Sequence, residues 1–257
     1  MLRFDGICKT FNPGTPDAAV VFRNFSLELK KGEFLSIVGS NGSGKTTLLN
    51  ILCGSIPADS GRILLSGEDI TRQKEHRRSA KMGRVFQDPS RGVCPSLTVL
   101  ENMALADRKG RRFGLSRGVE KKRAGYYQQQ LERLHLGLEN RLGQKVGALS
   151  GGQRQALALL LATMTPIDIL VLDEHTAALD PKSSENVMRL TDELVREKGL
   201  TTIMVTHNLK YAVQYGTRLI MMHGGAVVED RSGSEKQELE VSDLLTVFNA
   251  ISIECGN

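Results

Sequence analysis

The stretch Gly39-Ser40-Asn41-Gly42-Ser43-Gly44-Lys45-Thr46 decides the fold, because it matches the pattern G-x-x-x-x-G-K-[ST] without a gap. The apolar run Phe34 to Val38 before it predicts a buried strand, and Thr47 to Leu52 after it predicts a helix. Such a loop directs successive backbone N–H groups at one anion, and the helix N-terminus adds partial positive charge. A glycine-rich turn that holds a lysine by chance would lack these flanks. We therefore predict a phosphate-binding loop, in which Lys45 supplies a full charge and the Thr46 hydroxyl ligates Mg²⁺.

Length and composition are those of an ordinary protein with one substantial core. The chain has 257 residues, of which 40% are hydrophobic and 25% are charged. No stretch approaches the ~20 consecutive apolar residues of a membrane span, and the first residues contain no apolar targeting segment. The net charge of +5 is too small and too dispersed to indicate nucleic-acid binding. We expect a cytosolic chain that does not itself cross a bilayer.

One basic cluster stands out between Arg108 and Arg123. It contains Arg108, Lys109, Arg111, Arg112, Arg117, Lys121, Lys122 and Arg123 against one acid, Glu120. A solvated helical face is the first interpretation of such a run. Contact with anionic lipid headgroups or with an acidic loop of a partner is the second.

The chain before the loop predicts half-buried antiparallel strands. Leu2 to Lys9 and Val20 to Lys30 alternate apolar with polar residues, as strands with one buried face do. Between them, the turn-rich segment from Phe11 to Pro16 carries one aromatic ring. Phe11 is either a packing residue of the hairpin or a ring that stacks on a purine.

After the loop, the pattern changes to a helical region and then to a second predicted anion site. Residues from about Leu97 to Leu149 predict an inserted helical subdomain. Leu149-Ser150-Gly151-Gly152-Gln153 then begins a helix that we expect to end near Met164, with Ser150 as its N-cap. A helix N-terminus behind a Ser-Gly-Gly turn also fits a phosphate.

Two further buried strands end in polar residues. Ile169 to Leu172 is a continuous apolar run that ends in Asp173-Glu174, and Thr201 to Thr206 is followed by His207. Open α/β sheets bind ligands at the carboxyl ends of their parallel strands. We expect these side chains at the site of the phosphate loop.

Three motifs follow one another along the chain: the phosphate loop, the Leu-Ser-Gly-Gly-Gln pentad and the apolar strand that ends in Asp-Glu. With these motifs in this order, the chain resembles the nucleotide-binding subunit of ATP-binding cassette transporters from Leu2 to about Val228. The pentad is the discriminating motif, since other phosphate-loop ATPases lack it. The resemblance implies an α/β fold, with a P-loop NTPase (RecA-like) core, an antiparallel β subdomain and an inserted α-helical subdomain. It implies one cassette domain, divided into a core of residues 1–88 and 154–229, a helical subdomain of 89–153 and a C-terminal tail of 230–257.

The resemblance also implies a role for each motif. Two copies face head to tail, and each ATP lies between the phosphate loop of one copy and the pentad of the other. Asp173, Thr46 and Gln87 would hold Mg²⁺, and the catalytic set would be Glu174, which polarises the attacking water, with His207, Gln87 and Lys45. The implied nucleotide-binding residues are Phe11, Gly39, Ser40, Asn41, Gly42, Ser43, Gly44, Lys45, Thr46, Thr47, Ser150, Gly151, Gly152, Gln153 and Asp180.

One position departs from the family pattern, since the residue after Glu174 is commonly proline and here is His175. We expect this substitution to be inert, and the alternative is a titratable ring that shifts the pKa of Glu174 or contacts the dimer partner. The segments Phe11 to Thr15 and Asp173 to Thr176 resemble a bacterial importer branch, whose substrates are small solutes of the amino-acid type.

The predicted function is therefore an ATPase, with ATP and Mg²⁺ as its cofactors, that powers a membrane permease on the inner face of the cell membrane. Its expected partners are a second copy of itself, integral membrane permease subunits and, through them, an extracytoplasmic solute-binding protein, and no nucleic acid. The alternatives are a soluble cassette ATPase of the iron–sulfur assembly type, an exporter subunit, or a catalytically inactive regulatory cassette. Intact Lys45, Asp173, Glu174 and His207 argue against the last.

Overall fold

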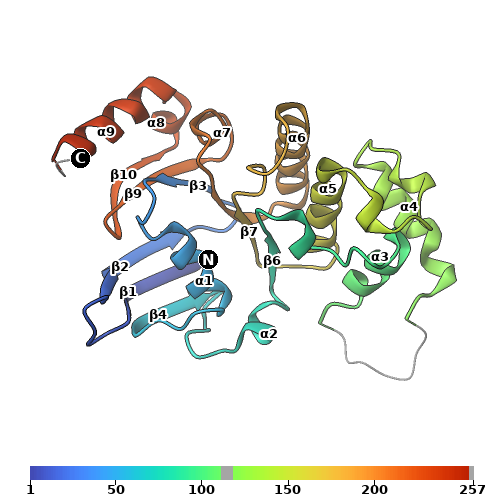
Figure 1. The fold of residues 1–257 in the computed structure, drawn as a ribbon, viewed down its shortest axis with the longest axis horizontal. Helices are drawn as coiled ribbons and strands as arrows, with labels where there is room; N and C mark the ends of the chain where they lie inside the picture. The colour runs from blue at the N-terminus through green and yellow to red at the C-terminus, as the bar shows by residue number, and fades with distance from the viewer. Residues whose placement is uncertain (111–117, 255–257) are drawn as a thin grey trace. The chain divides into compact units, whose positions relative to one another are not determined.

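The computed structural model describes residues 1–110 and 118–254, and the chain divides into two units (Figure 1). The first unit contains residues 1–79 and the segment from residue 199 onward, and the second contains residues 80–198. Within the described ranges, no helix combines the length and the apolar character that crossing a membrane requires. Arg111, Arg112 and Arg117 of the basic cluster, and the last three residues of the expected tail, lie outside the described residues.

The first unit begins with an antiparallel sheet in the order β2-β1-β4-β5. Its strands are β1 (Leu2–Phe11), β2 (Ala19–Leu29), β4 (Ser60–Leu65) and β5 (Glu68–Asp69). Buried and exposed residues alternate along β1 and β2, because successive side chains of a strand point to opposite faces. The buried rings of Phe22 and Phe25 lie 5.0 Å apart between centroids. The predicted antiparallel strands are confirmed, and β1 continues through Phe11 rather than ending at Lys9.

The same unit contains strands hydrogen-bonded in the order β10-β9-β3-β8. They are β3 (Phe34–Gly39), β8 (Thr201–Val205), β9 (Arg218–His223) and β10 (Ala226–Ser232). β3 pairs in parallel with both β8 and β9, whereas β10 pairs antiparallel with β9. Every residue of β3 and β8 is buried, as the continuous apolar runs predicted. The phosphate loop and His207 therefore follow the carboxyl ends of neighbouring parallel strands.

Helices of the first unit are α1 (Lys45–Cys53), α2 (Glu75–Arg78), α7 (Leu209–Gln214), α8 (Ser234–Gln237) and α9 (Val241–Glu254). The C-terminal segment is more ordered than its polar sequence indicated. Leu244 of α9 is 1% exposed and packs among Val38, Ala212, Leu219 and Met221. Leu244 thus anchors α9, which lies in the expected C-terminal tail, on the core of the first unit.

The second unit contains the parallel pair β6 (Met82–Val85) and β7 (Ile169–Asp173) with four α-helices among its described residues. The helices are α3 (Val99–Asp107), α4 (Ala124–Glu132), α5 (Gly151–Ala162) and α6 (Pro181–Lys198). Short 3-10 turns lie at Pro89–Arg91, Lys121–Arg123, Leu138–Asn140 and Val146–Ala148. The predicted helical region is confirmed, although it is interrupted by these turns.

Part of the basic cluster is paired with acids inside this unit. Arg123 Nε lies 2.7 Å from Asp107 Oδ2, and its guanidinium lies 4.8 Å from the centre of the Tyr126 ring. Arg108 pairs with Glu120 at 3.5 Å. These pairs and the bond from Lys109 Nζ to the Met82 carbonyl oxygen account for three of the basic residues. For the remaining described residues of the cluster, the solvated face and the anionic partner both stay predictions.

Candidate functional site

The phosphate loop joins β3 to α1 in a conformation that depends on glycine. Gly39 has φ 151°, and a Cβ there would lie 2.1 Å from the Met222 carbonyl oxygen of β9. Gly44 is the N-cap of α1 in the left-handed conformation and supplies no side-chain cap. Because no side chain caps the first N–H groups of α1, these donors are available to an anion.

Lys45 is folded back on the loop that carries it. Its ammonium donates to the carbonyl oxygens of Gly39 and Ser40, both at 2.8 Å, and to Ser43 Oγ at 3.4 Å. The residue is 5% exposed. A buried ammonium requires acceptors, and here the backbone of the loop provides them. The lysine is thereby held at the site where a phosphate is predicted.

Sequence reasoning assigned no role to His223, yet the structure places it on the phosphate loop. His223 Nδ1 lies 3.2 Å from Ser40 Oγ. The parallel register explains the contact, since Met222 of β9 is opposite Gly39 of β3. Only the strand order could have predicted this pair, because the two residues are far apart in the chain.

Two other predicted residues of the first unit lie on its surface. His207 is exposed directly after β8, and Asn208 next to it caps α7 by accepting from the Tyr211 N–H at 3.2 Å. Phe11 is partly exposed at the end of β1, with Lys9 Nζ 5.4 Å from its ring centre. That contact fits either a packing residue or a stacking ring, so both interpretations of Phe11 stand.

In the second unit, the predicted metal ligand Asp173 is paired with an arginine that sequence reasoning missed. Arg84 of β6 donates from Nη2 to Asp173 Oδ2 of β7 at 2.9 Å, and each side chain is 14% exposed. The guanidinium also lies 4.7 Å from the centre of the Phe86 ring, and Arg91 lies 4.6 Å from the same ring. Adjacent parallel strands bring Arg84 and Asp173 together.

Glu174 and His175 follow β7 in an unusual turn. Glu174 has φ 47°, a left-handed conformation that non-glycine residues seldom adopt and that functional sites often retain. His175 is 1% exposed, and its Nε2 lies 3.2 Å from Thr191 Oγ1 of α6. Burial lowers the pKa of His175 to about 4. The ring is therefore a neutral packing group inside the second unit, which supports the inert interpretation over contact with a dimer partner.

The pentad forms a capping box at the start of α5. Ser150 Oγ accepts from the Gln153 N–H at 3.2 Å, and Gln153 Oε1 accepts from the Ser150 N–H at 3.1 Å. A Cβ at Gly152 would lie 2.8 Å from Ser183 Oγ of α6, so glycine permits the close approach of the two helices. The predicted N-cap is confirmed, and the helix ends at Ala162 rather than near Met164.

Asp180 and Gln87 occupy exposed positions at the ends of elements of the second unit. Asp180 accepts from the Ser183 N–H at 3.0 Å, and hydrogen bonding with the Ser183 side chain and then with its N–H lowers the pKa of the Asp180 carboxyl. Gln87 follows β6, and the preceding Phe86 carbonyl accepts from Gln155 Nε2 of α5 at 3.0 Å. Gln155 is fully buried, and sequence reasoning missed it. It ties the pentad helix to the chain segment that leads into Gln87.

The predicted Mg²⁺ ligands have the chemistry that this ion prefers. Thr46 offers an exposed hydroxyl, Gln87 an exposed amide oxygen and Asp173 a carboxylate that already lies beside a cation, Arg84. Among the described residues, no group of three or more His, Cys, Asp or Glu residues could hold a metal by itself. The donor set fits Mg²⁺ if phosphate oxygens and water complete its coordination.

The predicted site residues fall into two sets, each inside one unit. The first unit holds Phe11, residues 39–47 of the phosphate loop and His207. The second holds Gln87, residues 150–153, Asp173, Glu174 and Asp180. Their assignment to nucleotide and metal stays a prediction.

Comparison with known proteins gives a consistent result. Residues 22–177 match the family described as "ABC transporter". The chain is 49% identical, over 96% of its length and 98% of the relative's, to a tyrosine transport ATP-binding protein of Clostridioides difficile. It is 35% identical, over 91% of its length and 84% of the relative's, to a phosphonates import ATP-binding protein of Alcaligenes faecalis. A solved dimeric ATP-binding cassette in a post-hydrolysis state with ADP and Pi matches with TM-score 0.76 and 31% identity, covering 90% of this chain and 98% of that one.

Proposed function

Because this chain belongs to the ABC transporter family and is an ATPase of that family, we propose that it powers a permease that imports tyrosine or a related aromatic amino acid. The observation that carries the proposal is the 49% identity to a tyrosine transport ATP-binding protein over nearly the whole of both chains. Importers of phosphonate, polyamine and sulfate are also related, at 34% to 35% identity. The greater identity favours an amino-acid solute.

The phosphate loop would bind the phosphates of ATP. Gly42 borders open space where they would lie, and the uncapped N-terminus of α1 supplies N–H donors. Lys45 would exchange the carbonyl oxygens of Gly39 and Ser40 for phosphate oxygens, which carry full negative charge. Ser40, positioned by His223, would donate its hydroxyl to the same group.

The residues of the second unit would act on the terminal phosphate. Glu174, held by its left-handed turn, would accept a proton from the water that attacks the γ-phosphorus. The bond between the γ-phosphorus and the oxygen that bridges it to the β-phosphate would then break, which releases ADP and inorganic phosphate. Gln87 and Asp173 of this unit, together with Thr46 of the first unit, are the proposed ligands of Mg²⁺, which when bound neutralises charge on the β- and γ-phosphates. Ser150 to Gln153 would bind the nucleotide held by a second copy of the chain.

Three partners follow from this proposal. They are a second copy of this chain, a multi-span permease on which the cassette docks at the inner membrane face, and a solute-binding protein outside the cytoplasm. Residues 89–103 are the segment we assign to the permease contact. The relatives named for import support this arrangement over a cassette of the iron–sulfur assembly type.

Uptake of labelled tyrosine by cells that express the chain together with its genomic neighbours tests the proposal. We expect that unlabelled phenylalanine competes with the labelled tyrosine for uptake, whereas phosphonate and spermidine do not. The Glu174→Gln variant should abolish uptake while the amount of protein in the cells is unchanged. The solute assignment is wrong if tyrosine uptake equals that of cells without the system. Purification from detergent-solubilised membranes then separates the remaining alternatives, because recovery of soluble partners alone would contradict transport itself.

A further inference from the structure

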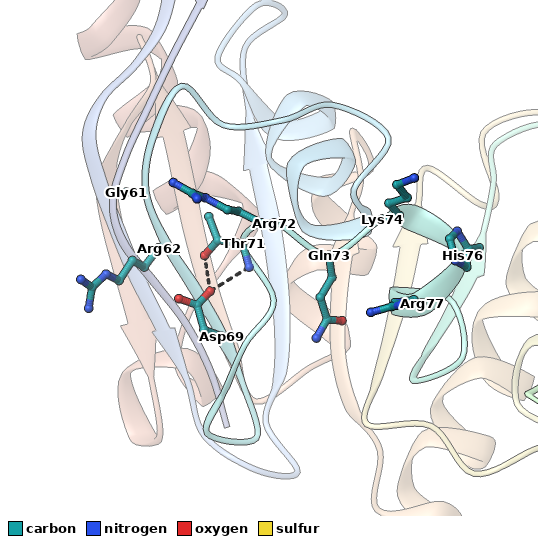
Figure 2. A pocket seen from close by; sticks show the side chains of 9 residues that line it. All are labelled: Gly61, Arg62, Asp69, Thr71, Arg72, Gln73, Lys74, His76 and Arg77. Carbon is teal, nitrogen blue, oxygen red and sulfur yellow. Dashed lines mark hydrogen bonds between the residues drawn. The ribbon is translucent and has the colours of Figure 1, made fainter.

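A basic pocket lies in the first unit, apart from every motif discussed above (Figure 2). It has a volume of about 930 Å³ and is formed by residues 61–77. Arg62, Arg72, Lys74 and Arg77 line it together with His76. Figure 2 shows Arg62 and Arg72 toward one end of the pocket and Lys74, His76 and Arg77 toward the other. All five side chains belong to exposed residues.

The acids near the pocket are bonded to neutral groups. Asp69 Oδ1 accepts from the N–H and the hydroxyl of Thr71 at 2.9 and 2.5 Å. Glu68 accepts from Gln73, and Glu75 accepts from Ser55 Oγ at 2.8 Å. Over the described part of the chain, none of the four permanent cations of the pocket forms an ion pair. Asp69, which also lines the pocket, interacts electrostatically with Arg62 and Arg72 and offsets part of their charge. The lining still carries more positive than negative charge, which a bound anion would offset.

A buried arginine holds the backbone segment that carries Arg72 and Arg77. Arg78 is 3% exposed and donates to the Thr71 and Gln73 carbonyl oxygens at 2.8 and 2.9 Å. It also donates to the Ile51 and Leu52 carbonyl oxygens, in the last turn of α1, at 2.7 and 2.8 Å. The frame that carries Arg72 and Arg77 is thus organised before any ligand binds, which lowers the entropic cost of binding. It is attached at the end of α1 remote from the phosphate loop.

We propose that this pocket is a second anion site, which binds a phosphate-bearing ligand of multiple negative charge through Arg62, Arg72, Lys74 and Arg77. Guanidinium groups present paired N–H donors that match phosphate oxygens, and several arginines favour phosphate over a single carboxylate. Two sources carry this chemistry: the headgroup of an anionic lipid and a free phosphorylated solute. The proposal does not depend on the identity of the transported solute.

The test uses the double variant Arg72→Gln/Arg77→Gln of the full chain. Arg189→Gln/Arg196→Gln is the matched control, because it removes the same charge from exposed arginines of α6 that are paired with Glu193 and Asp192. One arm titrates pyrophosphate calorimetrically into protein saturated with ADP, so that the phosphate loop is occupied. The other arm measures flotation with phosphatidylglycerol vesicles and with neutral phosphatidylcholine vesicles at low ionic strength.

We expect the pocket variant to weaken binding about ten-fold or more, since two charge-assisted contacts are removed, and the control to bind like the wild type. A loss confined to pyrophosphate identifies a soluble ligand, and a loss confined to anionic vesicles identifies a lipid headgroup. The proposal is overturned if wild type binds neither probe, or if the pocket variant and the control lose binding equally. ATPase activity in solution and urea unfolding should be unchanged in both variants.

Discussion

At the scale of single residues, the structure separates groups of the site that act on a ligand from groups that hold the fold. His175 stands beside the proposed base, but its ring is buried and bonded to Thr191, whose hydroxyl also donates to the Val187 carbonyl oxygen at 2.7 Å. Arg84, by contrast, received no role from the sequence and pairs with Asp173. Adjacency to Glu174 in the sequence therefore suggested a functional role for His175 that its burial does not support, and it gave no indication that Arg84 contacts Asp173.

We predict that His175→Ala lowers the free energy of unfolding by about 2 kcal/mol, because it leaves a cavity between the turn after β7 and α6. ATP hydrolysis per folded molecule should stay within a few-fold of wild type, measured well below the unfolding temperature. Glu174→Gln is the reference for lost catalysis. A loss in His175→Ala as deep as in Glu174→Gln would show that the ring takes part in the chemistry.

Arg84→Met should destabilise the chain by about 3 kcal/mol, because it leaves the Asp173 carboxylate mostly buried without its ion-pair partner. Arg91→Met is the matched control, since Arg91 contacts the same Phe86 ring. Loss of that cation–π contact should cost ~1 kcal/mol or less. Urea unfolding in the presence of EDTA measures both values. Equal losses would mean that the ion pair with Asp173 contributes nothing.

At the scale of elements, α3 and α5 begin with the same device. Thr98 and Glu101 form a capping box at α3, and Ser150 and Gln153 form one at α5. Only the second box belongs to the pentad. The pair of helices therefore offers an internal comparison between a cap that stabilises and a cap that we expect also to bind nucleotide.

Ser150→Ala and Thr98→Ala should each cost about 1 kcal/mol of stability, whereas Ser150→Asp should keep the cap and the stability, because its partner Gln153 is neutral. ATP hydrolysis should be lost only in Ser150→Asp, because its carboxylate would repel the γ-phosphate of the nucleotide held by the other copy. Thermal unfolding and a phosphate-release assay measure the two effects. An active Ser150→Asp variant would contradict the assignment of the pentad.

A partly buried lysine, Lys109, links the end of α3 to β6. Lys109, just after α3, donates to the Met82 carbonyl oxygen of β6, and burial lowers the pKa of its ammonium to about 8. Between pH 8 and 10.5 the unfolded chain binds this proton more tightly than the folded chain, so stability rises with pH in that window. We predict that the free energy of unfolding of the wild type, measured by urea unfolding, rises relative to that of Lys109→Met as the pH rises from 8 to 10.5. A difference that does not change with pH would contradict the shift.

At the scale of the whole molecule, the predicted site residues are divided between the two units, and the pentad is assigned to a nucleotide of another copy. A single chain would then be an incomplete enzyme. Symmetric head-to-tail dimers complete such sites reciprocally. This arrangement has a consequence that activity measurements on single variants cannot show.

We predict that Lys45→Ala and Ser150→Asp, each inactive alone, regain activity when mixed. The mixed dimer has one site with an intact Lys45 and an intact partner Ser150, so an equal mixture should reach about a quarter of wild-type activity if chains exchange at random. As a second measurement, Glu174→Gln with ATP should sediment as a dimer, whereas the same variant with ADP should not. A mixture no more active than its components would exclude the shared site.

Much of the site was predictable because its signals are local. The phosphate loop, the Ser150 cap and the buried strands ending at Asp173 and before His207 each depend on a few consecutive residues with a particular turn chemistry or apolar run. The local patterns did not predict α7, which begins after its N-cap Asn208. They also did not predict that Leu244 of α9 is buried, because the sequence before α9 is polar. Short helices that are stabilised by tertiary packing give weak patterns in the sequence.

The order of the amino acids was enough to identify the chemical groups of the site and the strands and helices with strong local patterns. Only the tertiary structure decided that Ser40 contacts His223, that Arg84 neutralises Asp173, that the His175 ring is buried, and that Arg78 organises a basic pocket. The physical reason is distance along the chain. Strand order and helix packing choose these partners, and burial keeps the His175 ring neutral, whereas periodicity and capping act only between neighbours in sequence.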